Sequence, residues 1–349
     1  MQKGVEKIHL YNFHDLLNVR ILIRRPSWFD SYLEKTFGYY EVKTLSSIDL
    51  SIDIGPFTPQ TQDCAMIDGK YFVRRDYIFY RTNYKMAWWE TEINGIEKET
   101  TQVGIQCNQF GRVVIPGETI YNLIRFKLAT KGYPLVHGSG VGKDGNAYLF
   151  SARGGTGKTI STLNFVRRGF DYYSDDSVIL GDHEILGFIV PFNLRFTYDV
   201  EALLGIKFSQ KTRRELFLKR LLYFLTLGQI SLFTTIEAKQ VFPSAIRDRA
   251  HLKKVYILFH GPEFTIEKNV PLEWAVNDLL INFQFECPEL ISLLLAYSYC
   301  YPENPLSDFW EKINERLVDS LRGIETHRIS IPIFYSDEIF NRVYEEVTG

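Results

Sequence analysis

The chain has 349 residues, 45% of them hydrophobic and 15% aromatic, which is enough for a sizeable core and excludes an intrinsically disordered protein. A formal net charge of −2 argues against a dedicated nucleic-acid binder. The four cysteines are scattered without a CxxC pair, which disfavours a disulfide framework or a zinc site and is typical of a reducing compartment. The N-terminal segment lacks the apolar run of a signal peptide, and no stretch of about 18 residues is apolar and uncharged. We therefore expect a cytoplasmic protein with no membrane association.

The N-terminal third, residues 1–117, has the pattern of a β-rich module. Residues 47–54 alternate between polar and apolar side chains, as a half-buried strand does. A helix is expected at residues 30–37, and further strands are expected at 71–80, 86–93, 101–108 and 112–115. The turn signal Asn94-Gly95 indicates a hairpin. Adjacent Trp88 and Trp89 could form a ligand platform, although burial of one side in the sheet is favoured.

A domain boundary is predicted near residues 115–120, so that residues 118–349 form a second domain. The order of its first elements indicates an α/β nucleotide-binding core. Helices are expected at 118–130 and 160–168, and strands at 135–141, 147–150, 178–180 and 185–190. A more helical C-terminal part follows. Its helices are expected at 199–204, 213–227, 272–285, 289–299, 306–321 and 337–347, and its strands at 255–259 and 328–334. Residues 216–233 are interpreted as an amphipathic core helix.

A glycine-rich turn, A-R-G-G-T-G-K-T at residues 152–159, separates the strand at 147–150 from the helix that follows. This order is that of a phosphate-binding loop, or Walker A motif, in which backbone N–H groups and the helix N-terminus cradle phosphates. Lys158 can reach the outer phosphates, and the Thr159 hydroxyl suits Mg²⁺. The predicted nucleotide contacts are Arg153, Gly154, Gly155, Thr156, Gly157, Lys158 and Thr159. The first motif position is Ala152 where glycine is usual.

Three further features could complete a phosphoryl-transfer site. His137 ends a strand before the turn, Asp175 and Asp176 follow the helix, and Arg247 lies downstream. One carboxylate could accept the proton of an attacking hydroxyl and the other could hold a metal, while a histidine and an arginine tune or neutralise charge. Each feature also has a plain structural interpretation: a solvated turn, a structural histidine and a surface arginine.

Residues 135–180 resemble the catalytic core of the HPr kinase/phosphorylase family, which phosphorylates a serine of a phosphocarrier protein. The matching motifs are His137-Gly138, the turn at 152–159, Arg168-Gly169 and S-D-D-S-V at 174–178. The resemblance extends to about residue 260, through A-I-R-D at 245–248. It implies a P-loop kinase fold of the HPr kinase/phosphoenolpyruvate carboxykinase type. By the same resemblance, Asp176 is the proton acceptor, His137 its partner, Lys158 a phosphate ligand, and Arg247 an active-site residue.

The resemblance also implies metal ligands: Thr159 and, at the nearest match to the family's metal-binding glutamate, Glu201. Asp175 is the further candidate ligand. The sequence around Glu201 differs from the family's L-E-I-R-G-L-G segment. This difference puts in doubt whether the chain shares the family's phosphocarrier substrate and its reverse reaction, phosphorolysis. Residues 1–115 show no likeness to the family's N-terminal domain.

The sequence therefore predicts a kinase that uses ATP, or another nucleotide, with Mg²⁺ to phosphorylate a hydroxyl, with a serine of a protein or peptide as the favoured acceptor. Two alternatives stay open: a nucleotide-binding sensor or ATPase that regulates a partner, and a small-molecule kinase, such as an amino-acid kinase, on the same core. A carboxykinase-like enzyme ranks lower. A homo-oligomer is compatible with the sequence.

Overall fold

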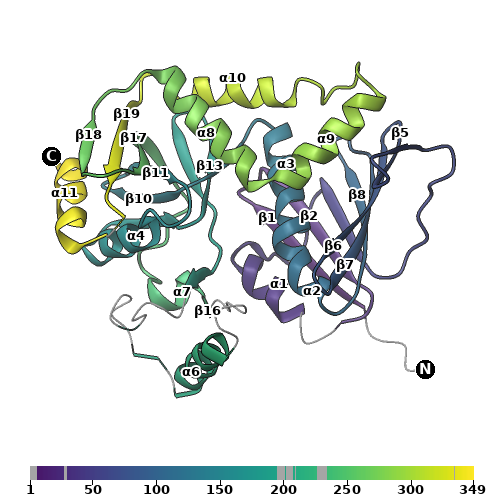
Figure 1. Ribbon diagram of the computed structural model, residues 1–349, viewed down its shortest axis with the longest axis horizontal. Helices are drawn as coiled ribbons and strands as arrows, with labels where there is room; N and C mark the ends of the chain where they lie inside the picture. Colours follow the sequence, from purple (N-terminus) through teal and green to yellow (C-terminus); the bar gives the residue numbers. More distant parts are fainter. Residues whose placement is uncertain are drawn as a thin grey trace. The chain divides into compact units, whose positions relative to one another are not determined.

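The computed structural model describes residues 6–26, 30–194, 201, 207–208, 210–225, 234–333 and 335–349 (Figure 1). It is a mixed α/β structure with two large sheets. The chain divides into two compact units: Met1–Leu135 with Leu280–Asp319, and Val136–Leu279 with Ser320–Gly349. This division differs from the predicted boundary at residues 115–120.

Helix α3 (Tyr121–Thr130) explains the difference in boundary. It was expected to open the second domain, but it is tied to the first unit. The Lys127 ammonium donates hydrogen bonds to the carbonyl oxygens of Lys98 and Glu99 at 2.9 and 2.7 Å. Burial lowers the pKa of Lys127 to about 8. The helix is therefore anchored to the loop at residues 95–100, which leads into the strand Thr101–Cys107 of the first sheet.

The first unit is built on an eight-stranded sheet in the order β1-β2-β3-β8-β7-β6-β5-β4. Strand β3 pairs in parallel with β2 and with β8, and the other neighbours are antiparallel. The strands are β1 (Lys7–Phe13), β2 (Leu17–Ile23), β3 (Leu50–Ile54), β4 (Ala65–Ile67), β5 (Tyr71–Arg74), β6 (Tyr77–Tyr84), β7 (Ala87–Asn94) and β8 (Thr101–Cys107). The predicted strand at 71–80 is two strands, because Asp76, with φ of 60°, turns the chain. The predicted β7–β8 hairpin is confirmed.

The prediction of a strand at residues 112–115 is wrong. Residues Gly111–Ile115 form helix α2, which continues through a wider helical turn at Pro116–Ile120 into α3. The Asn108 side-chain oxygen accepts a hydrogen bond from Gly111 N at 2.7 Å and starts this turn. A run as short as Val-Val-Ile has no period that separates strand from helix. Of the two neighbouring tryptophans, Trp89 is buried in the sheet and Trp88 is 38% exposed.

Four more helical segments complete the first unit: α1 (Asp30–Phe37), the single turn Gly38–Tyr40, α9 (Pro288–Cys300) and the first part of α10 (Phe309–Leu321). Glu289 of α9 accepts a hydrogen bond from Thr82 of β6 at 2.7 Å, and Tyr297 donates one to Glu97 at 2.6 Å. The C-terminal helical part that the sequence predicts as an extension of the second domain thus packs partly on the first sheet.

The second unit contains a nine-stranded sheet whose central strand is β17 (Arg249–His260). It pairs in parallel with β11 (Asn146–Ala152) and β19 (Glu325–Ile331), and antiparallel with β14 (Glu184–Gly187). The other strands are β9 (Leu135–His137), β10 (Ser139–Lys143), β12 (Asp171–Ser174), β13 (Ser177–Leu180) and β18 (Thr265–Glu267). The predicted strand at 135–141 is broken at Gly138, whose N–H donates to the Asp176 carbonyl at 3.0 Å. A separate ribbon pairs β15 (Phe192–Leu194) with β16 (Thr234–Ile236).

Helices α4 (Lys158–Arg167) and α11 (Asp337–Thr348) of the second unit lie side by side (Figure 1). An aromatic core fixes them. The Phe150 ring of β11 stacks on Tyr256 of β17 at 5.0 Å between centroids, and on Phe165 of α4 at 5.5 Å. Phe165 also meets Phe340 of α11 edge-on at 5.2 Å. Because these rings are fully or almost fully buried, β11 and α4 are held rigidly at both ends of the turn that joins them.

Three more helices are α6 (Gln210–Leu225), α7 (Ala238–Val241) and α8 (Leu272–Glu286). The predicted helix at 199–204 lies outside the described residues, apart from Glu201. Within the described part of the chain no single helix is long and apolar enough to cross a membrane; α8 and α9 reach that composition only as a pair bent by 91°.

Candidate functional site

The glycine-rich turn lies between the end of β11 at Ala152 and the start of α4 at Lys158. The predicted order of strand, turn and helix is therefore confirmed. Gly155 and Gly157 have φ values of 92° and 85°, a region that L side chains rarely adopt. These positive angles require glycine and let the chain turn sharply into the N-terminus of α4. The turn has the shape for gathering backbone N–H groups around an anion.

Gly157 is also pressed against the ring of Tyr335, a residue that the motif does not reveal. A Cβ atom on Gly157 would come within 2.5 Å of that ring, whereas one on Gly155 would meet nothing nearer than His260 Nε2 at 3.9 Å. The Tyr335 hydroxyl makes a short hydrogen bond with Ser161 of α4. The ring therefore closes one side of the turn and fixes its conformation.

Gly157→Ala is expected to destabilise the protein more than Gly155→Ala does. Both changes force alanine into a positive φ, which costs about 1 kcal/mol, but only the first also overlaps a packed ring, which adds about 1–3 kcal/mol. Urea unfolding of both variants measures the difference. Adding Tyr335→Ala should shrink the gap between them, and equal free energies of unfolding for the two single variants would contradict the packing.

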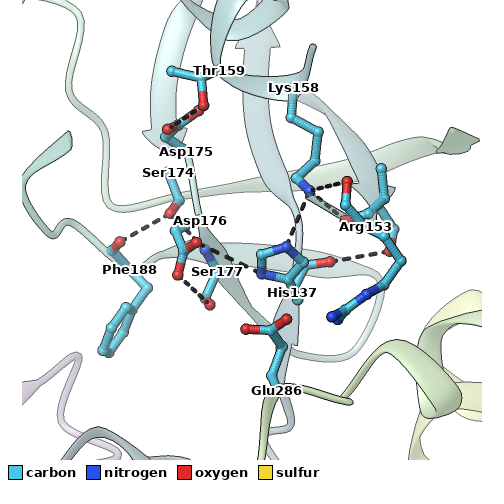
Figure 2. Close-up of polar contacts among 12 residues, drawn as sticks. His137, Arg153, Lys158, Thr159, Ser174, Asp175, Asp176, Ser177, Phe188 and Glu286 are labelled. Carbon is cyan, nitrogen blue, oxygen red and sulfur yellow. Dashed lines mark hydrogen bonds and ion pairs between the residues drawn. The ribbon is translucent and has the colours of Figure 1, made fainter. Parts of the chain in front are cut away.

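A chain of polar contacts joins Lys158, His137 and Asp176 (Figure 2). Lys158 Nζ lies 3.1 Å from His137 Nε2, and His137 Nδ1 lies 3.7 Å from Asp176 Oδ1. An ammonium group only donates, so Nε2 must accept from Lys158. A neutral imidazole then carries its proton on Nδ1, on the side of Asp176, although 3.7 Å is too long for a direct hydrogen bond. Lys158 also donates to the carbonyl oxygens of Ala152 and Arg153, which hold the buried ammonium under the turn.

Asp176 has an accessible carboxylate on a fixed backbone. Its side chain is 54% exposed, while its carbonyl accepts from Gly138 N at 3.0 Å. Ser177 Oγ lies 3.4 Å from Asp176 Oδ2, and the neighbouring Ser174 hydroxyl is anchored to the Phe188 carbonyl at 3.0 Å (Figure 2). A carboxylate that is anchored on one side and open to solvent on the other can receive a proton from an incoming group.

Asp175, one residue earlier, lies in a different environment. Its Oδ2 accepts a hydrogen bond from the Thr159 hydroxyl at 2.9 Å. Burial, and then the charge of Asp176, raise the pKa of Asp175 to about 7, although Thr159 and Lys158 act in the opposite direction. The residue is half-buried, but its Oδ1 is inaccessible, and no described residue donates a hydrogen bond to that atom. A buried oxygen without a donor, beside a hydroxyl oxygen, is a site that a cation would satisfy.

Thr159 and Asp175 therefore fit Mg²⁺, which is commonly held by one or two protein oxygens plus waters and substrate phosphates. No cluster of three or more His, Cys, Asp or Glu side chains suited to a metal occurs among the described residues. This excludes a metal cage made by the described protein side chains alone, but a nucleotide-associated Mg²⁺ needs no such cage.

The structure does not bring the remaining two predicted residues to this group. Arg247 forms an ion pair with Asp171 at 3.2 Å, at the start of β12, whereas Asp175 and Asp176 follow the end of that strand. Glu201 pairs with Arg213 of α6 at 2.8 Å. The active-site role of Arg247 and the metal-ligand role of Glu201 stay predictions.

Sequence reasoning missed Tyr335 and His260. His260 ends β17, and its Nδ1 lies 3.3 Å from the Ile331 carbonyl, so that Nδ1 donates and Nε2 is left facing the glycine-rich turn. The turn, His260 and Tyr335 follow the carboxyl ends of three adjacent parallel strands, β11, β17 and β19. Ligands of α/β sheets commonly bind at that edge. The position of His260 at a strand end was the available signal, but only with the strand order known.

Comparison with known proteins gives a distant similarity. No protein-family model matches the chain, and no curated protein matches it. Among solved structures, the chain is similar to the Hpr(Ser) kinase/phosphatase from Coxiella burnetii, with 12% sequence identity and a TM-score of 0.26. The similarity covers 61% of this chain and 92% of that one. At this level the similarity is remote, so the function must be inferred from the side chains of the site.

Proposed function

We propose that this protein is a nucleotide-dependent kinase that transfers the γ-phosphoryl group of ATP to a hydroxyl. The observation that carries the proposal is the pair of carboxylates beside the glycine-rich turn, in two different environments. Asp175 is tied to Thr159 at the start of α4, and Asp176 faces solvent next to His137. A site that only binds or hydrolyses a nucleotide needs one acid for the metal, but not a second, open carboxylate beside a histidine.

The donor nucleotide would bind with its phosphates in the turn at 153–157. The backbone N–H groups of the turn, the N-terminus of α4 and Lys158 would neutralise its charge. Phosphoryl transfer requires mainly positioning and charge neutralisation, which these groups supply. Mg²⁺, held by Thr159 and Asp175, would supply further charge neutralisation at the phosphate oxygens.

The acceptor hydroxyl would lie against Asp176. As its oxygen forms a bond with the γ-phosphorus, the bond between that phosphorus and the β–γ bridging oxygen breaks, and ADP leaves with the electron pair. The hydroxyl proton passes to Asp176 Oδ. The proton on His137 Nδ1 keeps Asp176 oriented, and Lys158 keeps that proton on Nδ1 by occupying Nε2.

The hydroxyl that accepts the phosphoryl group belongs to a protein, a peptide or a small molecule. We favour a serine of a protein or peptide, because an exposed carboxylate such as Asp176 can be approached by a large acceptor. A free amino acid is the runner-up. The test is incubation of the purified chain with γ-labelled ATP, Mg²⁺ and cell extract. Label in one protein or peptide supports the proposal, label in a small metabolite supports the runner-up, and label recovered only as free phosphate would reject kinase activity.

Thr159→Val is expected to weaken Mg²⁺-dependent nucleotide binding by at least about tenfold, because it removes both an oxygen ligand and the hydrogen bond that orients Asp175. Thr159→Ser keeps the hydroxyl and is the matched control. Titration of labelled ATP at several Mg²⁺ concentrations measures the effect. If the valine variant has the Mg²⁺ dependence of the serine variant, Thr159 is not a metal ligand.

A further inference from the structure

Helix α6 exposes an apolar face that the proposed kinase site does not use. The sequence predicts a core helix here, but five large apolar side chains of α6 are 43–72% exposed: Phe217, Leu218, Leu221, Phe224 and Leu225. At 3.6 residues per turn they fall within an arc of about 120°, on one side of the helix. Together they expose on the order of 500 Å² of mostly apolar surface, near the upper limit for a typical monomer.

The same helix is strongly basic. Its sequence, QKTRRELFLKRLLYFL, has five basic residues and one acidic residue, a net charge of +4 in a chain whose net charge is −2. On a helical wheel Arg213 and Arg220 border one side of the apolar arc, and Arg214 lies within it. The one acidic residue, Glu215, is paired with Lys219 at 2.6 Å, away from the arc. The α6 residues that border or lie within the described face are therefore apolar or basic, although Arg213 is paired with Glu201 at 2.8 Å.

We propose that α6 is a membrane-surface helix, which lies on an anionic lipid bilayer with Phe217, Leu221 and Phe224 inserted below the headgroups. A helix of this kind combines a bulky apolar stripe with flanking lysines and arginines that attract anionic headgroups. It lies in the plane of the interface and needs no membrane-spanning segment, so the absence of a spanning helix among the described residues does not oppose it. The expectation of no membrane association rested on the absence of such a segment.

Charge complementarity favours a bilayer over a second copy of this chain. Pairing α6 with α6 would bury the two apolar arcs but would bring their flanking arginines together, which is unfavourable. An anionic bilayer accepts the apolar side chains and attracts Arg214, which lies within the arc. The Lys and Arg side chains can also extend along the apolar surface while their charges reach the headgroups.

The test is co-sedimentation of the full chain with vesicles of phosphatidylcholine alone, or of equal parts phosphatidylcholine and phosphatidylglycerol. We expect binding to the mixed vesicles only, and release when the ionic strength rises from about 0.1 M to about 1 M. The triple variant Phe217→Ser/Leu221→Ser/Phe224→Ser should lower the partition coefficient at least tenfold, and Arg214→Gln should lower it about fivefold.

A matched triple variant controls for the loss of exposed apolar helix residues in general. Ile281, Leu295 and Tyr299 are 41%, 63% and 80% exposed on α8 and α9, and changing all three to Ser should leave vesicle binding unchanged. Thermal unfolding of both triple variants checks that they fold. No binding to mixed vesicles, equal binding to both vesicle types, or unchanged binding of the α6 variant would each overturn the proposal. So would a dimer in solution that the α6 variant dissociates without any vesicle binding, since a second copy would then cover this face.

Discussion

Asp176→Asn is expected to lower phosphoryl transfer by about 10²–10⁴-fold, because an amide cannot accept the proton of the attacking hydroxyl. Asn has the shape of Asp, and the side chain is 54% exposed, so folding should be preserved. Nucleotide affinity should stay near the wild-type value, because the predicted phosphate contacts lie on the turn and on α4. Single-turnover transfer from labelled ATP, together with equilibrium binding of the nucleotide, measures both quantities on the same variant.

The control for Asp176→Asn is Asp144→Asn, at an exposed turn of the same unit. Asp144 has a φ of 53°, which Asn tolerates as well as Asp does, so this change should affect neither transfer nor binding. Wild-type transfer by the Asp176 variant would remove the general base from the mechanism. Unchanged ATP hydrolysis by that variant, with no labelled acceptor in the wild type either, would favour the sensor or ATPase alternative.

The local part of the site could be predicted from the sequence because its determinants are local. A buried strand, a turn that needs positive φ at Gly155 and Gly157, and a helix that starts at Lys158 are encoded within about 20 consecutive residues. The juxtaposition of His137, Lys158 and Asp176 also involves short connections, since His137 ends β9, Lys158 starts α4 and Asp176 follows β12, all within 40 consecutive residues. The resemblance also predicts that His137 and Asp176 are partners.

The rest of the site depends on packing between segments that are distant in sequence, and a local sequence pattern cannot predict such packing. Tyr335 meets Gly157 only because β19 lies next to β17 and the chain returns to the same edge of the sheet. The strand order that produces this contact pairs β11 with β17, whose partner residues are 105 or 106 positions apart in sequence, and β17 with β19, whose partners are 71 apart. The division into compact units differs from the predicted domain boundary for a similar reason, because Lys127 and Glu289 bind loops and strands that are distant in sequence.

The amphipathic pattern of α6 had a different ambiguity. An apolar stripe predicts that one face of a helix is covered, but it does not say by what. The prediction of a core helix assumed that the chain itself covers the stripe. The exposure of Phe217 and Phe224 shows that the described part of the chain does not cover the stripe.

Lys158→Met is expected to impair both nucleotide binding and transfer, in contrast to Asp176→Asn. Methionine keeps the length of the side chain but removes the charge, and a hydrogen bond from an ammonium to a phosphate contributes about 1.5–3 kcal/mol. Binding should therefore weaken by about 10- to 100-fold, and transfer should fall by at least about 10²-fold as charge neutralisation in the transition state is lost. Isothermal titration with ATP and single-turnover transfer give the two numbers.

Lys158→Met also tests whether His137 and Asp176 act as one unit with Lys158. The variant leaves His137 Nε2 without the Lys158 donor, so the imidazole is free to place its proton on either nitrogen and no longer orients Asp176 through Nδ1. If the chain of contacts matters, His137→Gln should cost little further transfer in the Lys158→Met background, although it is costly alone, because effects within one unit do not add. Lys143→Met, an exposed lysine at the end of β10, is the control for charge loss. Additive losses in the double variant would mean that Lys158 acts on the phosphates alone and that His137 positions Asp176 independently.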